Sequence, residues 1–148
     1  MKKVLLVFVT VLFLVPQAFA QNTGKGVGVI IGEPTGISLK LWQSSSIAFD
    51  GGLAWSIGPN SRFHFHGDYL IHNKEVLNSP NAIFYFGPGL RLRLGDEDRI
   101  GVRGVAGVDI YFKQAPIDFF IEVAPILDLI PGTYLSFNAG FGFRYFFN

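Results

Sequence analysis

The sequence predicts an all-β fold, an eight-stranded antiparallel up-and-down barrel. Beyond Gln21 no segment keeps a helical period for longer than a turn or two. Short runs instead alternate between apolar residues and small or polar ones, and turn-rich breaks separate these runs at fairly even spacing. There are eight such runs, an even number, and the chain has no cysteine. Stability must therefore come from backbone pairing and burial.

The breaks define each strand in order along the chain. The first two runs end at GEP and QSS, the next two at GPNS and NKEVLNSP, and the following three at GDED, KQA and PG. Gly, Pro, Asn, Asp and Ser dominate these breaks, and they are the residues that suit tight turns. The expected strands are residues 25–31, 35–42, 46–57, 62–72, 82–94, 99–112, 116–130 and 133–147.

Most of these runs have one large apolar face and one face of small and charged residues, because successive side chains of a strand point in opposite directions. In the run 62–72, for example, Phe63 and Phe65 alternate with His64 and His66. The apolar faces of the third to sixth runs and of the last run are Ile47, Phe49, Leu53, Trp55 and Ile57; Phe63, Phe65, Tyr69 and Ile71; Phe84, Phe86, Leu90, Leu92 and Leu94; Ile100, Val102, Ala106, Val108, Ile110 and Phe112; and Leu135, Phe137, Ala139, Phe141, Phe143, Tyr145 and Phe147.

The small, charged face indicates the interior of a closed barrel. A sheet surface in water is expected to be rich in Lys, Glu, Thr and Gln, whereas this face combines Gly and Ala with charges of both signs in near balance. Small residues also suit the narrow inside of an eight-stranded barrel. We therefore expect a transmembrane barrel whose apolar face meets lipid. The expected charge network of the lumen is Lys40, Asp50, Asp68, Arg91, Arg93, Arg103, Asp109, Glu122 and Arg144, and Asp118 and Asp128 share its face.

The same alternation would also suit a secreted or periplasmic soluble barrel of the lipocalin type, with its apolar face turned inward around an apolar ligand. Such a core would have to pack most of the 16 Phe residues, which is many for its volume. Strand length favours the membrane, since a tilted membrane strand needs about 9–11 residues. Eight such strands with short turns would use nearly all of the exported chain.

The N-terminus predicts export. Lys2 and Lys3 precede an apolar run at 4–15, and Ala18 and Ala20 supply the small residues of a cleavage site before Gln21. Residues 1–20 are therefore interpreted as a signal peptide and residues 21–148 as one barrel domain. The apolar run is shorter than the roughly 20 residues of a membrane anchor. Without the two lysines the net charge is roughly −1, and no basic run suggests nucleic acid.

The chain ends NAGFGFRYFFN, which resembles the C-terminal sorting signal of bacterial outer-membrane barrels. That signal has a polar residue, a Gly two positions later and two bulky apolar residues spaced by one. With the signal peptide and the eight strands, the whole exported chain resembles the small OmpA/OmpX-like outer-membrane β-barrels of Gram-negative bacteria. The stretch GVGVIIGEPTGISLKLW is also similar to uncharacterised barrels of that kind. The residues that match the sorting signal are Asn138, Gly140, Phe143 and Tyr145, with Phe147 continuing their face.

The resemblance implies an outer-membrane location, contact with outer-membrane lipid, and insertion by the barrel-assembly machinery, with a monomer favoured. Both termini would face the periplasm, so the turns at 32–34, 58–61, 95–98 and 131–132 would face outward. These turns are short, which argues against an adhesin, and the longest connection, 73–81, would lie on the periplasmic side. The family includes structural barrels, adhesins and lipid-modifying enzymes. We expect a structural or envelope-associated role without catalysis and without a cofactor.

Three groups of residues suggest chemistry. His64, His66 and Asp68 lie on one face of their strand, where adjacent positions are about 6.6 Å apart. At this spacing two imidazoles and a carboxylate could hold a metal. The interpretation we favour is that they are lumenal residues hydrogen-bonded to the interior charges. The arginines could line an anion path, although an ion-paired plug is favoured because eight strands leave no substantial pore.

A lipid A-modifying enzyme would need a Ser and a His within hydrogen-bonding reach, and no serine is obviously paired with either of the two adjacent histidines. Pro88 and Pro125 each remove a hydrogen bond from an expected strand, which is tolerated mainly at bulges or strand ends.

Overall fold

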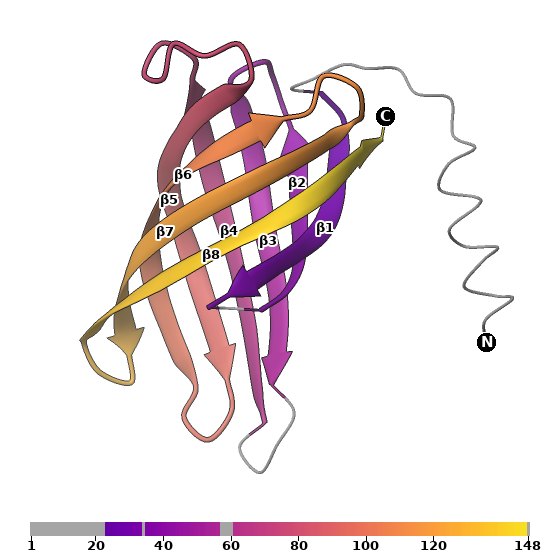
Figure 1. The fold of residues 1–148 in the computed structure, drawn as a ribbon. Helices are drawn as coiled ribbons and strands as arrows, with labels where there is room; N and C mark the ends of the chain where they lie inside the picture. Colours follow the sequence, from indigo (N-terminus) through magenta and orange to yellow (C-terminus); the bar gives the residue numbers. More distant parts are fainter. Residues whose placement is uncertain (1–22, 34, 57–60, 148) are drawn as a thin grey trace, which may run out of the picture.

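The computed structural model describes residues 23–33, 35–56 and 61–147, which form a closed barrel of eight antiparallel strands (Figure 1). The fold predicted from the sequence is confirmed, and each expected strand end is at most one residue from the observed one. The expected signal peptide lies outside the described residues, as do Pro34 and residues 57–60 in two expected turns. The strands are β1 (Lys25–Gly32), β2 (Gly36–Trp42), β3 (Ile47–Ser56), β4 (Arg62–Asn73), β5 (Ala82–Leu94), β6 (Arg99–Tyr111), β7 (Ile117–Ile130) and β8 (Tyr134–Phe147).

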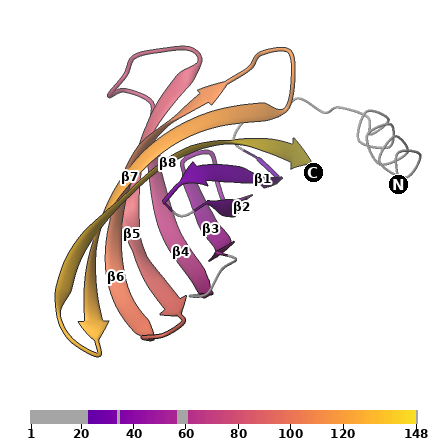
Figure 2. The ribbon, with the colours of Figure 1, turned by 60° about the horizontal axis from the view of Figure 1, so that its bottom comes forward.

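Each strand pairs with the next along the chain, and β1 pairs with β8 to close the barrel. The closing register runs from Lys25 opposite Phe147 to Gly32 opposite Gly140. Figure 2 shows the strands wrapping around a common axis. Closure pairs what would otherwise be two exposed sheet edges. Among the described residues, no helix is long and apolar enough to cross a membrane.

The wall of the barrel is uneven in height. β1 and β2 have 8 and 7 residues, whereas β7 and β8 have 14 each. In Figure 1 the β1–β2 hairpin stops well above the lower ends of the neighbouring strands. The last residues of β1, β3, β5 and β7 lie at this end, and the last residues of β8 and the connection 74–81 lie at the other.

Side chains are partitioned in the opposite sense to a soluble protein. Phe65, Phe86 and Phe141 point outward and are 45%, 43% and 43% exposed, respectively. Arg103 and Asp109 point inward and are 4% and 0% exposed. The alternation of burial along β7 and β8 is almost unbroken, as expected for strands with one face inside a closed barrel.

Glycines on the inner face make room for inward-pointing rings. Tyr85 stands opposite Gly107 on the neighbouring strand, and a Cβ atom on that glycine would lie 2.5 Å from the tyrosine hydroxyl. Phe120 lies in the same way over Gly142, at 2.7 Å from the position of the missing Cβ atom. Small residues on one strand and rings on the next therefore fill the narrow interior together.

The two strand prolines coincide with interruptions of the ladder. Pairing of β4 with β5 runs to Asp68–Gly89 and resumes at Ile71–Phe86, so the gap includes Pro88. Pairing of β6 with β7 runs to Arg103–Ile126 and resumes at Ala106–Val123, and the gap includes Pro125. A proline has no N–H to donate, which explains why regular pairing stops at these two places.

Candidate functional site: the charged interior

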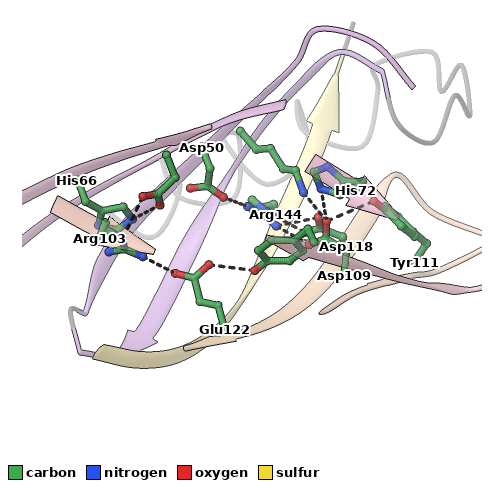
Figure 3. Close-up of polar contacts among 12 residues, drawn as sticks. Asp50, His66, His72, Arg103, Asp109, Tyr111, Asp118, Glu122 and Arg144 are labelled. Atoms are coloured by element: carbon green, nitrogen blue, oxygen red, sulfur yellow. Dashed lines mark hydrogen bonds and ion pairs between the residues drawn. The ribbon is translucent and has the colours of Figure 1, made fainter. Parts of the chain in front are cut away.

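Arg144 lies at the centre of the interior network. Its guanidinium reaches from β8 to carboxylates on three other strands (Figure 3). The Nη1 atom lies 2.6 Å from Asp50, Nη2 lies 2.8 Å from Asp109, and Nε lies 3.1 Å from Asp118. The guanidinium carbon lies 4.0 Å from the centre of the Phe120 ring. One fully buried arginine thus ties together β3, β6, β7 and β8.

Asp109 is the second branching point. Its carboxylate forms buried ion pairs with Arg144 and with the Lys40 ammonium. It also lies 3.2 Å from His72 Nε2 and accepts a hydrogen bond from the Tyr111 hydroxyl at 3.4 Å. The Lys40 ammonium also lies 5.0 Å from the centre of the Tyr85 ring. A carboxylate with this many donors is well compensated for the loss of water.

A second cluster forms around Arg103. Its guanidinium lies 3.0 Å from Asp68 and 3.5 Å from Glu122, and the Tyr85 hydroxyl donates to Glu122 at 2.9 Å. Figure 3 shows how Glu122 lies between the Arg103 cluster and the Arg144 cluster. The two clusters therefore fill the middle of the barrel with ions of both signs.

A third group lies nearer the end that carries the short turns. Arg91 forms a buried ion pair with Asp128, and Arg99 Nη1 lies 3.6 Å from the same carboxylate. Arg99 also reaches Glu97 at 2.8 Å on the surface, and its guanidinium lies over the Tyr134 ring at 4.7 Å. One carboxylate thus serves two arginines here.

Eight of the nine predicted lumen charges are buried, and Asp118 and Asp128 are buried with them. The exception is Arg93, which is half-buried near the end of β5 and makes no ion pair among the described residues. The buried carboxylate of Asp128 is already shared by Arg91 and Arg99. Arg93 therefore lines a cavity of the lumen but does not take part in the ion pairs that the other eight predicted charges form.

Sequence reasoning did not identify the rings that take part in the network. Tyr85 and Tyr111 donate hydrogen bonds to interior carboxylates, and Trp42 and Phe120 lie against Lys40 and Arg144. Parity placed both tyrosines on the inner face, and this was the available signal. The partner of Tyr85 lies on another strand, 37 residues away, where no local pattern shows it. The partner of Tyr111 is Asp109, two residues earlier on the same strand.

The candidate metal ligands are only partly brought together. His66 and Asp68 join Asp50, and one ligand atom from each lies within 4.8 Å of the other two, whereas His64 is outside this group. Asp68 and Asp50 each already contact a guanidinium, that of Arg103 and that of Arg144. This favours the ion-paired interpretation of these residues over a metal site.

The residues that resemble a sorting signal lie on β8, which closes the barrel against β1. Asn138 and Gly140 point inward and are buried, while Phe143 and Phe147 point outward and Tyr145 is half-buried. Comparisons with protein-family models, with curated proteins and with solved structures gave no match to this chain.

Proposed function

We propose that this protein is an integral outer-membrane β-barrel with a structural or envelope-associated role, stabilised by an ion-paired, filled lumen and without catalysis. The observation that carries the proposal is the partition of side chains across the wall of a closed barrel. Valine, isoleucine, leucine and phenylalanine side chains cover the outside, and the buried charges lie inside. Lipid on the outside accounts for both halves of this partition.

The outer surface would be costly in water. Monomeric soluble proteins rarely expose a contiguous apolar patch of more than a few hundred Å². Here exposed apolar residues recur on every strand: Val29 on β1, Leu39 on β2, Phe49 on β3, Phe65 on β4 and Leu90 on β5 represent the pattern. On β6, β7 and β8 the pattern continues with Val102, Val123 and Phe137.

The inner face argues against a lipocalin-type container and against a wide channel. An apolar ligand would need an apolar cavity, whereas fully buried Arg144, Lys40 and Asp109 occupy the middle of this barrel. The one hydrophobic core cluster among the described residues is small, and it consists of Leu70, Tyr85, Val105 and Ala124. Paired ions and rings leave a structural role as the function that the interior supports best.

Fractionation and gel mobility test the location. The full chain, expressed in a Gram-negative host, should be recovered from the outer membrane only with detergent. The folded protein should migrate differently on a gel before and after heating, because a closed barrel resists unheated detergent. A soluble periplasmic pool whose mobility is unaffected by heating would contradict the proposal and favour the lipocalin-type alternative.

A separate experiment addresses catalysis. Deletion and overexpression of the protein should both leave the lipid A profile unchanged when it is measured by mass spectrometry. A lipid A species that appears on overexpression and disappears on deletion would replace the structural role with the lipid-modifying alternative.

A further inference from the structure

A cavity of about 310 Å³ lies at the end of the barrel that carries the short turns. We call it the vestibule. Its lining comes from the β1–β2 turn, from β3, β4 and β5, and from β8, and it includes Trp55, Arg62, His64, Arg91, Arg93 and Asn138. Because the β1–β2 hairpin is short, this side of the wall is low (Figure 1) and leaves the cavity open to the outside of the barrel.

Basic side chains form a row at this end of the barrel, and two of them, His64 and Arg93, line the vestibule. In the register of β4, β5 and β6, His64 stands opposite Arg93, and Arg93 stands opposite Arg99. Arginines directly opposite one another on neighbouring strands, as Arg93 and Arg99 are, repel. Arg99 has carboxylate partners, whereas Arg93 has no ion pair or hydrogen bond among the described residues. An anion placed between these strands would remove that repulsion.

Three polar atoms in the same lining are buried without a hydrogen-bond partner among the described residues. They are Arg91 Nε, His64 Nε2 and Asn138 Nδ2. The side chains of Arg91 and Asn138 are 5% and 8% exposed, so little water reaches them. A buried polar atom without a hydrogen-bond partner loses the water it would contact in the unfolded chain and gains nothing in return. Three such atoms around one cavity indicate a missing acceptor-rich partner.

The vestibule also contains one acidic side chain, that of Glu33 in the β1–β2 turn. Glu33 is exposed, and its backbone N–H donates to the carbonyl of Ala139 at 2.9 Å. Against this carboxylate the lining has three arginines, of which Arg91 already forms an ion pair with Asp128. Arg93, which has no ion pair among the described residues, adds a positive charge to the cavity that attracts anions.

We propose that the vestibule binds a phosphoryl group, held by Arg93 and Arg91 and by the free donors of His64 and Asn138. A phosphate offers several acceptor oxygens and matches the planar fork of a guanidinium. The cavity has about ten times the volume that one water molecule occupies in the liquid, so it holds more than a bare ion. The exposed ring of Trp55 at its edge provides an apolar surface for the remainder of the molecule that carries the phosphate.

The phosphoryl group has two possible sources, a soluble phosphate ester and a lipid headgroup. The site stands on the cavity and its donors, so it does not depend on the membrane location proposed above. Pyrophosphate serves as the soluble probe, and phosphatidic acid in mixed micelles serves as the lipid probe, with phosphatidylcholine as the neutral lipid. Both are titrated into the full exported chain folded in dodecyl maltoside, and binding is followed by tryptophan fluorescence.

At least one of the two probes is expected to bind saturably and to change the fluorescence. Arg93→Gln should weaken that binding about tenfold or more, because it removes a positive charge that forms no ion pair among the described residues. Lys113→Gln removes one positive charge from the connection between β6 and β7 at the opposite end, and it should change the affinity less than about twofold. Trp55→Phe should abolish the fluorescence change, since the other tryptophan, Trp42, does not line the vestibule.

Saturation by pyrophosphate identifies a soluble ester as an accessible ligand, and saturation by phosphatidic acid alone identifies a headgroup. Binding of neither probe, or equal affinities for Arg93→Gln and the unchanged chain, would overturn the proposal. If Arg93→Gln does not reach the heat-modifiable folded form, Asn138→Ala takes its place, because it removes a buried donor without changing the charge. The same loss of affinity is then expected, and an unchanged affinity overturns the site.

Discussion

A single arginine holds a large share of the interior together. Arg144 contacts three carboxylates that are 94, 35 and 26 residues away in the sequence. Its flat guanidinium directs its donors along fixed directions, which a lysine ammonium cannot reproduce. Because all of its partners are buried, the removal of this cation would leave several negative charges close together without water.

We therefore predict that Arg144→Met lowers the free energy of unfolding by about 3–5 kcal/mol, the range for breaking a buried ion pair by removing one partner. Urea titration of the detergent-folded barrel measures this change. The free energy of unfolding of Arg144→Lys should lie between those of Arg144→Met and the unchanged chain, since lysine keeps the positive charge and loses the planar guanidinium. Lys113→Met, an exposed change at one end, is the control and should have little effect. Equal stabilities of Arg144→Met and the control would show that the network contributes little.

Parity along each strand predicts which charges point inward, and the structure buries all of them except Arg93, which is half-buried and lines the vestibule. Parity cannot predict which charges meet. Asp109 on β6 and Arg144 on β8 are not on neighbouring strands, and they meet only because both side chains extend across the interior. Such contacts depend on barrel diameter and stagger, which no local pattern of residues specifies.

At the scale of the strand, the sequence predicts where elements begin and end better than it predicts which charges meet. Turn residues such as those around Gly95 and Pro131 are strong local signals, and the strand ends could be placed within one residue. The positions of the two pairing gaps could not be predicted from the sequence. A proline shows that one N–H donor is missing, but not on which side of the strand. Which neighbour loses the pairing depends on the direction in which that residue faces in the finished sheet.

The gaps predict uneven protection of backbone amides. Tyr69 and Leu70 beside the first gap, and Gly104 and Val105 beside the second, should exchange hydrogen faster than residues paired without interruption. Hydrogen–deuterium exchange in detergent micelles, read by NMR or by mass spectrometry of peptides, measures this difference. The β1–β8 seam is the internal control, since its pairing from Lys25 to Gly32 is unbroken. Protection as strong at the gaps as along the seam would mean that other bonds bridge them.

At the scale of the whole molecule, the inverted partition makes a quantitative prediction. Phe141 lies at the middle of β8 and points outward, and Phe112 lies just beyond the end of β6. In a bilayer, an outward arginine costs about 2–4 kcal/mol at the midplane and about 0–1 kcal/mol near the interface. Phe141→Arg should therefore destabilise the barrel much more than Phe112→Arg.

Reversible unfolding in lipid vesicles measures both variants. In water the two substitutions would each place a charge on a surface, and both would be tolerated or even improve solubility. A large cost at the middle of the strand and a small one at its end is thus specific to a lipid environment. Similar small costs at both positions would contradict the outer-membrane proposal, even if the fold itself remained intact.

The orientation of the barrel decides which compartment the vestibule faces, and the chain is well suited to testing it because it contains no cysteine. The proposed outer-membrane location, with the orientation that the resemblance implies, predicts that the end of β8 and the connection 74–81 face the periplasm. A cysteine at Thr133, in the β7–β8 turn, should then react with a membrane-impermeant maleimide on intact cells. A cysteine at Lys74, in the 74–81 connection, should react only after the outer membrane is permeabilised. The two sites lie at opposite ends, so each is the control for the other. The reverse pattern would place the vestibule in the periplasm. The phosphorylated molecules that it could bind would then be those of that compartment.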